Sequence, residues 1–142
     1  MKKKDLEISL QSLGTFRDPK VQLEQYPTPS VIASDILFSA YAAGDVAGKR
    51  IADLGCGTGI FAIGAGLLGA ESVSAFDTDP EAIEIAKENA SKLDCEIEFV
   101  RCDVTEVTGR YDTVLMNPPF GSQNKHADRP VLAKARESAD SV

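Results

Sequence analysis

One short segment of the chain has residue types that suit chemistry on an amino group. Asn117-Pro118-Pro119-Phe120 directly follows the apolar run at 111–116. Two consecutive prolines cannot continue a strand, because proline lacks the backbone donor and its φ angle is fixed. The apolar run is therefore predicted to be a strand that ends at Asn117 and presents the groups that follow it to a ligand.

These groups could activate a poor nucleophile. An aromatic amino or amide nitrogen has a delocalised lone pair, and the carbonyls of the Asn117 side chain and the Pro118 backbone could both accept its hydrogens. Held between two acceptors, the nitrogen would localise its lone pair and attack a nearby electrophile. The ring of Phe120 would stack on a planar substrate, a contact worth about 1 to 3 kcal/mol per base. The alternative is an ordinary turn after a strand.

A second segment predicts a nucleotide-type cofactor site. A short strand at 50–54 carries Asp53, and Gly55-Cys56-Gly57-Thr58-Gly59 follows it before an apolar helix that starts at Ile60. A strand, a glycine turn and a helix N-terminus together offer bare backbone N–H groups and the positive end of a helix dipole. Gly57-x-Gly59-x-x-Ala62 also fits a dinucleotide-binding fold, so this motif alone does not decide the cofactor.

Polar residues also end the later strands. A strand at 72–76 leads into Asp77, 18 residues beyond the last glycine of the turn, where a carboxylate could accept both ribose hydroxyls. A third strand at 96–100 precedes Asp103, which could accept an adenine amino group, and Val104, which could cover the ring. Strands alternate with helices, which predicts an α/β fold with a parallel sheet and ligands at the carboxyl ends of its strands.

Composition restricts the class of protein. The 142 residues fit one domain, and 43% hydrophobic residues suffice for a core. The net charge of -7 argues against a general nucleic-acid binder, but residues 51–108 hold twelve acidic and three basic side chains, so a polyanion could approach the flanks. The longest apolar stretch, 60–68, is too short to span a membrane.

Cysteine usage and the N-terminus predict a protein of the cytoplasm. Three cysteines form no CxxC pair, which favours a reducing compartment and no structural metal site. The first five residues, Met-Lys-Lys-Lys-Asp, lack the apolar core of a secretion signal. The segment at 25–30 contains two prolines and is predicted to be extended, so it could form one wall of a pocket or serve as a structural linker.

In combination, these motifs resemble those of the class I S-adenosylmethionine-dependent methyltransferases that modify amino nitrogens. The resemblance rests on residues 53–59, Asp77, Asp103 and the segment 117–120. More narrowly, Glu24-Gln25-Tyr26-Pro27-Thr28-Pro29 and residues 117–122 resemble the ribosomal RNA adenine-N6 methyltransferases typified by methyltransferase-like protein five and its archaeal relatives.

The resemblance implies a Rossmann-like sheet with helices on both faces. It implies one methyltransferase domain over 1–142, with a helical segment at 1–48, a cofactor-binding core at 49–120 and a substrate loop and helix at 121–142. Such enzymes are expected to have seven strands, whereas only four are predicted here. The sheet is therefore expected to be truncated after the fourth strand.

The resemblance also implies the cofactor, S-adenosyl-L-methionine, and the residues that bind it. The implied cofactor-binding residues are Gln25, Tyr26, Thr28, Asp53, Gly55, Gly57, Thr58, Gly59, Ile60, Asp77, Asp103 and Val104. Gln25 and Thr28 would lie near the methionine end, the glycine turn would pass under the cofactor, and Asp77 would hold its ribose. The implied catalytic residues are Asn117, Pro118, Pro119 and Phe120.

The implied reaction is methyl transfer to adenine N6 in RNA, namely small-subunit ribosomal RNA. The rate enhancement would come from alignment and exclusion of water, because no strongly basic catalyst is apparent. The resemblance further implies a small zinc-binding activator protein that adds a strand beside the third strand. The alternatives are a protein glutamine N5 methyltransferase and a truncated cofactor-binding module without activity. A nicotinamide dehydrogenase is harder to reconcile with the proline pair.

Overall fold

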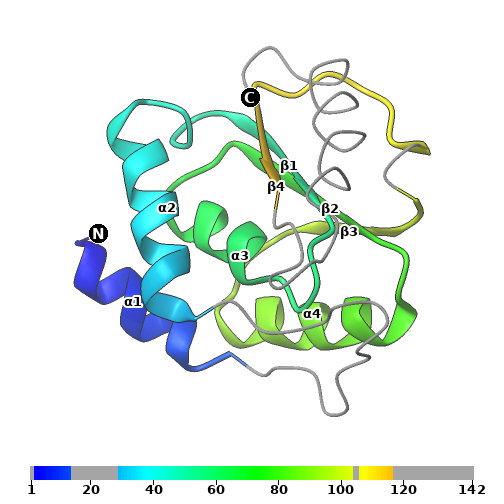
Figure 1. The fold of residues 1–142 in the computed structure, drawn as a ribbon, viewed down its shortest axis with the longest axis horizontal. Helices are drawn as coiled ribbons and strands as arrows, with labels where there is room; N and C mark the ends of the chain where they lie inside the picture. Colours follow the sequence, from blue (N-terminus) through cyan, green and yellow to red (C-terminus); the bar gives the residue numbers. More distant parts are fainter. Residues whose placement is uncertain (1, 14–28, 104–105, 117–142) are drawn as a thin grey trace, which may run out of the picture.

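The computed structural model describes residues 2–13, 29–103 and 106–116, which form four helices and four strands (Figure 1). In chain order they are α1 (Lys3–Gln11), α2 (Ser30–Ala42), β1 (Arg50–Leu54), α3 (Ile60–Leu67), β2 (Ser72–Asp77), α4 (Pro80–Lys92), β3 (Glu98–Arg101) and β4 (Thr113–Met116). The four predicted strands are confirmed, with ends that differ from the prediction by at most two residues. None of the helices in these three ranges is long and apolar enough to cross a membrane.

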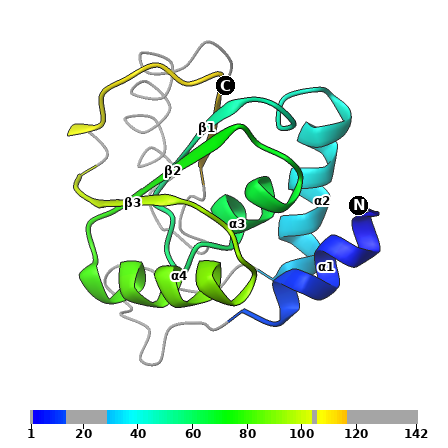
Figure 2. The ribbon, with the colours of Figure 1, turned by 180° about the vertical axis from the view of Figure 1, so that it is seen from behind.

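The strands form one parallel sheet in the order β3-β2-β1-β4. The connections through α3 and α4 run in the same direction along the sheet, so right-handed crossovers place both helices on one face. Figures 1 and 2 show α3 and α4 on this face, with α1 and α2 beside α3. The predicted α/β class with a Rossmann-like sheet is confirmed.

The larger hydrophobic core lies between this sheet face and the helices. Leu6 of α1 and Leu37 of α2 are fully buried and pack with Ile51 and Ile63. The close approach of α2 to α3 requires a glycine, because a Cβ at Gly64 would overlap the Leu37 side chain. The N-terminal helices therefore belong to the same packed unit as the sheet.

A smaller core covers the opposite face of the sheet. Leu54 and Phe76 point to this side and pack against Val107 and Tyr111, which come from the connection between β3 and β4. In the sheet, β3 and β4 lie at opposite ends of the order β3-β2-β1-β4, so the connection between them must cross the sheet. The helix that the resemblance implies within 121–142 lies outside the described residues.

Two helices start in different ways. Asp79 caps α4 by accepting the backbone N–H of Glu81 at 3.0 Å, and Pro80 occupies the first helical position. At α2, Pro29 precedes the helix without a side-chain hydrogen bond, and Ser30 is already helical.

Candidate cofactor site

The sheet brings the carboxyl ends of its four strands to one edge. Leu54 at the end of β1 pairs with Phe76 of β2 on one side and with Met116 of β4 on the other. Asp77 at the end of β2 pairs with Arg101 of β3. Neighbouring strands lie about 4.8 Å apart. The predicted meeting of the strand ends is therefore confirmed.

The glycine turn after β1 is bound to the end of β2. The backbone N–H groups of Gly55 and Cys56 both donate to the carbonyl oxygen of Phe76, at 2.8 and 2.9 Å. Within the turn, the N–H of Gly59 donates to the carbonyl of Cys56 at 2.9 Å. The predicted bare N–H groups are therefore wrong at these positions, since the donors already have protein acceptors that fix the shape of the turn.

Asp77 provides the third connection between β2 and the turn. Its Oδ2 accepts the N–H of Gly57 at 2.8 Å, so Gly57 is also not a bare donor, and its Oδ1 accepts the N–H of Asp79 at 2.9 Å. The Asp77 side chain is half-buried. Each carboxylate oxygen has a further lone pair, so both could still accept a hydroxyl. The ribose-binding role of Asp77 stays a prediction.

Gly59 at the start of α3 cannot be replaced without strain. Its φ is +93°, in the left-handed region, and a Cβ there would lie 3.2 Å from the Cβ of Ala86 and 3.3 Å from the Cδ1 of Ile63. The turn therefore packs directly on α4. Its neighbours Thr58 and Ile60 are respectively buried and half-buried, and the cofactor roles predicted for them stay predictions.

Asn89 is a site residue that the sequence analysis missed. It lies on α4, is 1% exposed, and donates its side-chain N–H to the carbonyl of Thr58 at 3.0 Å. A buried amide of this kind fixes the position of the carbonyl that it contacts. The sequence contained a signal, because Asn89 follows Ala82, Ile85 and Ala86 on the buried face of α4.

Asp53 is fully buried near the tip of β1, and neither of its carboxylate oxygens has a hydrogen-bond partner among the residues that the structure describes. Burial, and secondarily the charge of Asp77, raise the pKa of Asp53 from 3.8 to about 7. The backbone N–H of Ala62, in the first turn of α3, lowers this pKa without forming a well-shaped hydrogen bond. An uncompensated buried carboxyl is costly. The cofactor-binding role of Asp53 stays a prediction.

Asp103 lies just beyond β3 and is exposed. Its backbone N–H donates to Oε1 of Glu106 at 2.9 Å, and the preceding residue, Cys102, donates its N–H to the carbonyl of Asp77 at 3.0 Å. The residue directly before Asp103 is therefore hydrogen-bonded to the backbone of Asp77. Its predicted contact with adenine stays a prediction.

Several predicted site residues lie outside the described residues. These are Gln25, Tyr26, Thr28, Val104, Asn117, Pro118, Pro119 and Phe120. The chain reaches the last four directly from Met116, which pairs with Leu54 at the edge that carries the glycine turn.

The residues that are described fit an adenosyl cofactor with a positive charge. A half-buried carboxylate ends β2, a fixed glycine turn lies beside it, and the unpartnered carboxyl of Asp53 would be stabilised by a cation. Sheet order and site together define a Rossmann-like domain that binds a nucleotide-type cofactor at the carboxyl ends of its strands.

Comparisons with known proteins agree with this class. The family model of the methyltransferase small domain matches residues 31–140. An uncharacterized protein of Methanocaldococcus jannaschii is 43% identical over all of this chain and 69% of its own length. The rRNA N(6)-adenosine-methyltransferase METTL5 of Danio rerio is 40% identical over all of this chain and 72% of its own length.

Solved structures agree as well. The crystal structure of a proposed RNA methyltransferase from Pyrococcus horikoshii is 50% identical, with a TM-score of 0.90 over 97% of this chain and 70% of that one. A Synechocystis magnesium protoporphyrin IX methyltransferase with bound S-adenosylmethionine shares the fold, with a TM-score of 0.69 and 20% identity. The chain belongs to the methyltransferase small domain family and is a class I S-adenosylmethionine-dependent methyltransferase.

Proposed function

We propose that this methyltransferase transfers a methyl group to adenine N6 in RNA, and that its substrate is small-subunit ribosomal RNA. Two relatives that are 40% and 38% identical are named rRNA N(6)-adenosine-methyltransferases, from Danio rerio and Drosophila melanogaster. The proposed RNA methyltransferase from Pyrococcus horikoshii supports the same substrate class.

The pairing of Leu54 with Met116 is the observation that carries the proposal. It brings the end of β4 to the glycine turn, and the sequence continues from Met116 into Asn117-Pro118-Pro119-Phe120. The residues that can accept an amino group thus follow directly on the edge that carries Asp53 and Asp77. A dinucleotide-dependent dehydrogenase would have no evident use for two acceptor carbonyls at this position.

When bound, S-adenosylmethionine supplies an electrophilic methyl group on a sulfonium. Asp77, Asp103 and the turn at 55–60 would hold it, together with Gln25, Tyr26, Thr28, Asp53 and Val104. Asn117 and Pro118 would accept the hydrogens of the adenine amino group, Pro119 would keep the segment rigid, and Phe120 would stack on the base. Orientation and exclusion of water supply the acceleration.

A methyl-transfer assay tests the substrate. The protein is incubated with labelled S-adenosylmethionine and ribosomal RNA from cells that lack the gene, and digested nucleosides are separated. We expect label in N6-methyladenosine and none in RNA from cells that carry the gene. Label confined to another nucleoside would overturn the proposal.

Methylation of a protein glutamine amide is a second candidate. The same two acceptors suit an amide NH2, and a Methanocaldococcus jannaschii protein provisionally named as a protein N5-glutamine methyltransferase is 34% identical over 70% of this chain. Release factors in the same assay distinguish the two candidates. Cofactor binding by calorimetry without transfer to either substrate would favour a binding module without activity.

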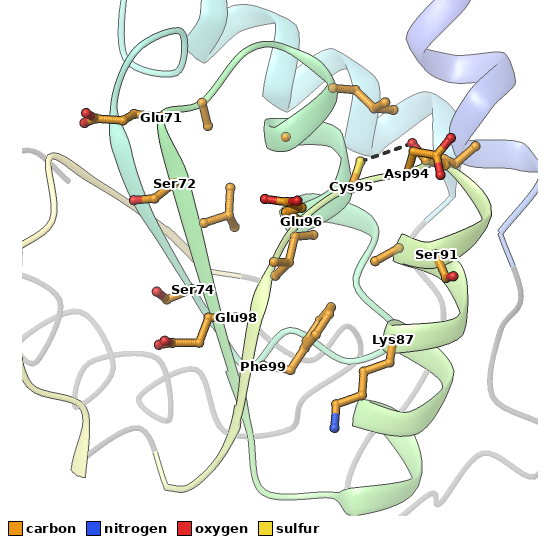
Figure 3. A pocket seen from close by; sticks show the side chains of 17 residues that line it. Glu71, Ser72, Ser74, Lys87, Ser91, Asp94, Cys95, Glu96, Glu98 and Phe99 are labelled. Atoms are coloured by element: carbon orange, nitrogen blue, oxygen red, sulfur yellow. Dashed lines mark hydrogen bonds between the residues drawn. The ribbon is translucent and has the colours of Figure 1, made fainter.

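We further infer that a small zinc-binding activator docks beside β3. Among the strands that the structure describes, β3 ends the sheet order on one side, so its backbone could pair with an added strand. A groove of about 1280 Å³ lies next to it, between β2, β3 and α4, lined by Glu71, Cys95 and Phe99 among others (Figure 3). This groove lies at the amino ends of the strands, away from the cofactor edge.

The domain plan and location remain part of the proposal. The single domain over 1–142 is supported by the joint core of α1, α2 and the sheet. A cytoplasmic location is supported by Cys56, Cys95 and Cys102, which are all free thiols.

A further inference from the structure

The carboxyl of Asp53 is in an environment that favours its neutral form. It is 0% exposed, and within the described part of the chain neither of its oxygens has a hydrogen-bond partner. In the register of the sheet its neighbours are Ala75 of β2 and Leu115 of β4, which are apolar and buried. A carboxylate in such surroundings lacks both water and donors, so its charge is strongly disfavoured.

The charged and titratable groups around Asp53 do not offset this burial. Among the described residues, Asp77 at the end of β2 adds a second negative charge. The Cys56 thiol of the glycine turn is buried, and burial followed by the charges of Asp53 and Asp77 raises its pKa, so it stays neutral. The backbone N–H of Ala62 on α3 lowers the pKa of Asp53, but its effect is smaller than that of burial and of the Asp77 charge.

We propose that Asp53 is a proton-linked positioning residue, which is protonated without cofactor and loses its proton when the cofactor binds. S-adenosylmethionine carries a positive sulfonium and an ammonium group, and a cation entering this site stabilises the ionised carboxyl. The O–H bond of Asp53 breaks and the proton goes to the buffer, while no electrons are transferred. The inference rests on the cofactor assignment and assigns a pH response to the same site.

The geometry predicts the direction of the pH response. The pKa of Asp53 without cofactor is about 7. If the bound cation lowers the pKa of Asp53 well below 5, the apparent affinity for S-adenosylmethionine rises with pH. The dissociation constant then falls about eightfold between pH 5.5 and 6.5. The cofactor ammonium remains protonated in this interval, so it does not contribute.

Isothermal titration calorimetry of the full chain with S-adenosylmethionine tests the proposal. The titration is repeated at pH 6 in buffers with different ionisation enthalpies, and the slope of binding enthalpy against ionisation enthalpy counts the released protons. We expect about one proton per cofactor. A slope of zero with intact binding overturns the inference and leaves the methyltransferase function standing, whereas absence of binding overturns both.

Two variants separate Asp53 from other titrating groups. Asp53→Asn keeps the shape of the side chain and removes the proton, so the slope is expected to approach zero. Asp35→Asn is the matched control, because Asp35 lies on α2 and pairs with Lys3 at the surface; it is expected to retain the slope. A slope unchanged in Asp53→Asn contradicts the proposal.

An infrared difference spectrum provides a test that does not depend on folding of the variant. Addition of cofactor to the wild-type protein at pH 6 is expected to remove a protonated carboxyl band and add a carboxylate band. A spectrum without loss of a protonated carboxyl overturns the proposal.

Discussion

The carboxylate of Asp77 accepts the backbone N–H of Gly57 at 2.8 Å, which joins the end of β2 to the glycine turn after β1. One side chain therefore fixes the turn and remains available, through its other lone pairs, to a ligand. The cofactor site thus depends on a contact between two residues, Gly57 and Asp77, that are 20 positions apart in the sequence.

Asp77→Asn should weaken both functions of this carboxylate. An amide can accept only one of the two N–H groups and turns its own donors toward the other. We expect S-adenosylmethionine affinity to fall at least about tenfold and stability to fall by about 1.5 to 3 kcal/mol. Calorimetry and denaturant unfolding measure the two effects. Unchanged affinity would show that Asp77 serves the turn alone.

Gly59→Ala should damage the start of α3 and the packing of α4. Alanine at a φ of +93° costs about 1 to 2 kcal/mol, and its Cβ would press on Ala86 and Ile63. Gly44→Ala is the control, because Gly44 has a φ of +84° but no atom within 4 Å of a new Cβ. We expect unfolding experiments to show a larger loss for Gly59→Ala, and only this variant to lose cofactor affinity. Equal losses would contradict the packing argument.

Asn89→Asp tests the buried amide beneath the turn. The change replaces a donor by an acceptor opposite the carbonyl of Thr58 and leaves that carbonyl without its partner. We expect a loss of about 1 to 3 kcal/mol in unfolding free energy, and weaker cofactor binding in titrations at pH 8. Asn89→Asp with wild-type stability and affinity would mean that the hydrogen bond does not position the turn.

Asp53 should make the cofactor-free protein less stable as pH rises. Its folded pKa of about 7 exceeds the unfolded value of 3.8, so the folded state binds this proton more tightly. The protonation of Asp53 therefore adds on the order of 4 kcal/mol to the free energy of unfolding below pH 4. This stabilisation is lost between pH 4 and 7, and no further change is expected above pH 7.

Denaturant unfolding across this pH range measures the effect as the difference between wild type and Asp53→Asn. The variant should gain relative stability with rising pH. A difference that does not change between pH 4 and 8 would contradict the raised pKa of Asp53.

The sheet was predictable from sequence because each strand is a short apolar run followed by a polar residue or a turn. Asp77 and Gly57 were also predictable as site residues, since their motif has a fixed spacing. Their mutual hydrogen bond was not, because it depends on the register of β1 and β2. The prediction of bare N–H groups in the glycine turn was wrong for the same reason, because the acceptors for Gly55, Cys56 and Gly57 lie on β2.

Helix faces were harder to predict. Ile32 and Ile36 recur at helical spacing in α2, yet they are 39% and 48% exposed, while Ala33 and Leu37 are fully buried. Because apolar residues lie on more than one side of α2, the sequence does not indicate which side is buried. Packing against the neighbouring helices determines the buried side. Asn89 was overlooked because a polar residue on a helix is usually read as exposed.

Methyl transfer to ribosomal RNA by the wild-type protein and by Asn117→Ala, under saturating cofactor, tests the central claim most directly. The account predicts N6-methyladenosine with the wild type, and a loss of at least about a hundredfold in rate with Asn117→Ala while S-adenosylmethionine still binds. Undiminished transfer by Asn117→Ala would contradict the claim that the segment after β4 holds the target amino group.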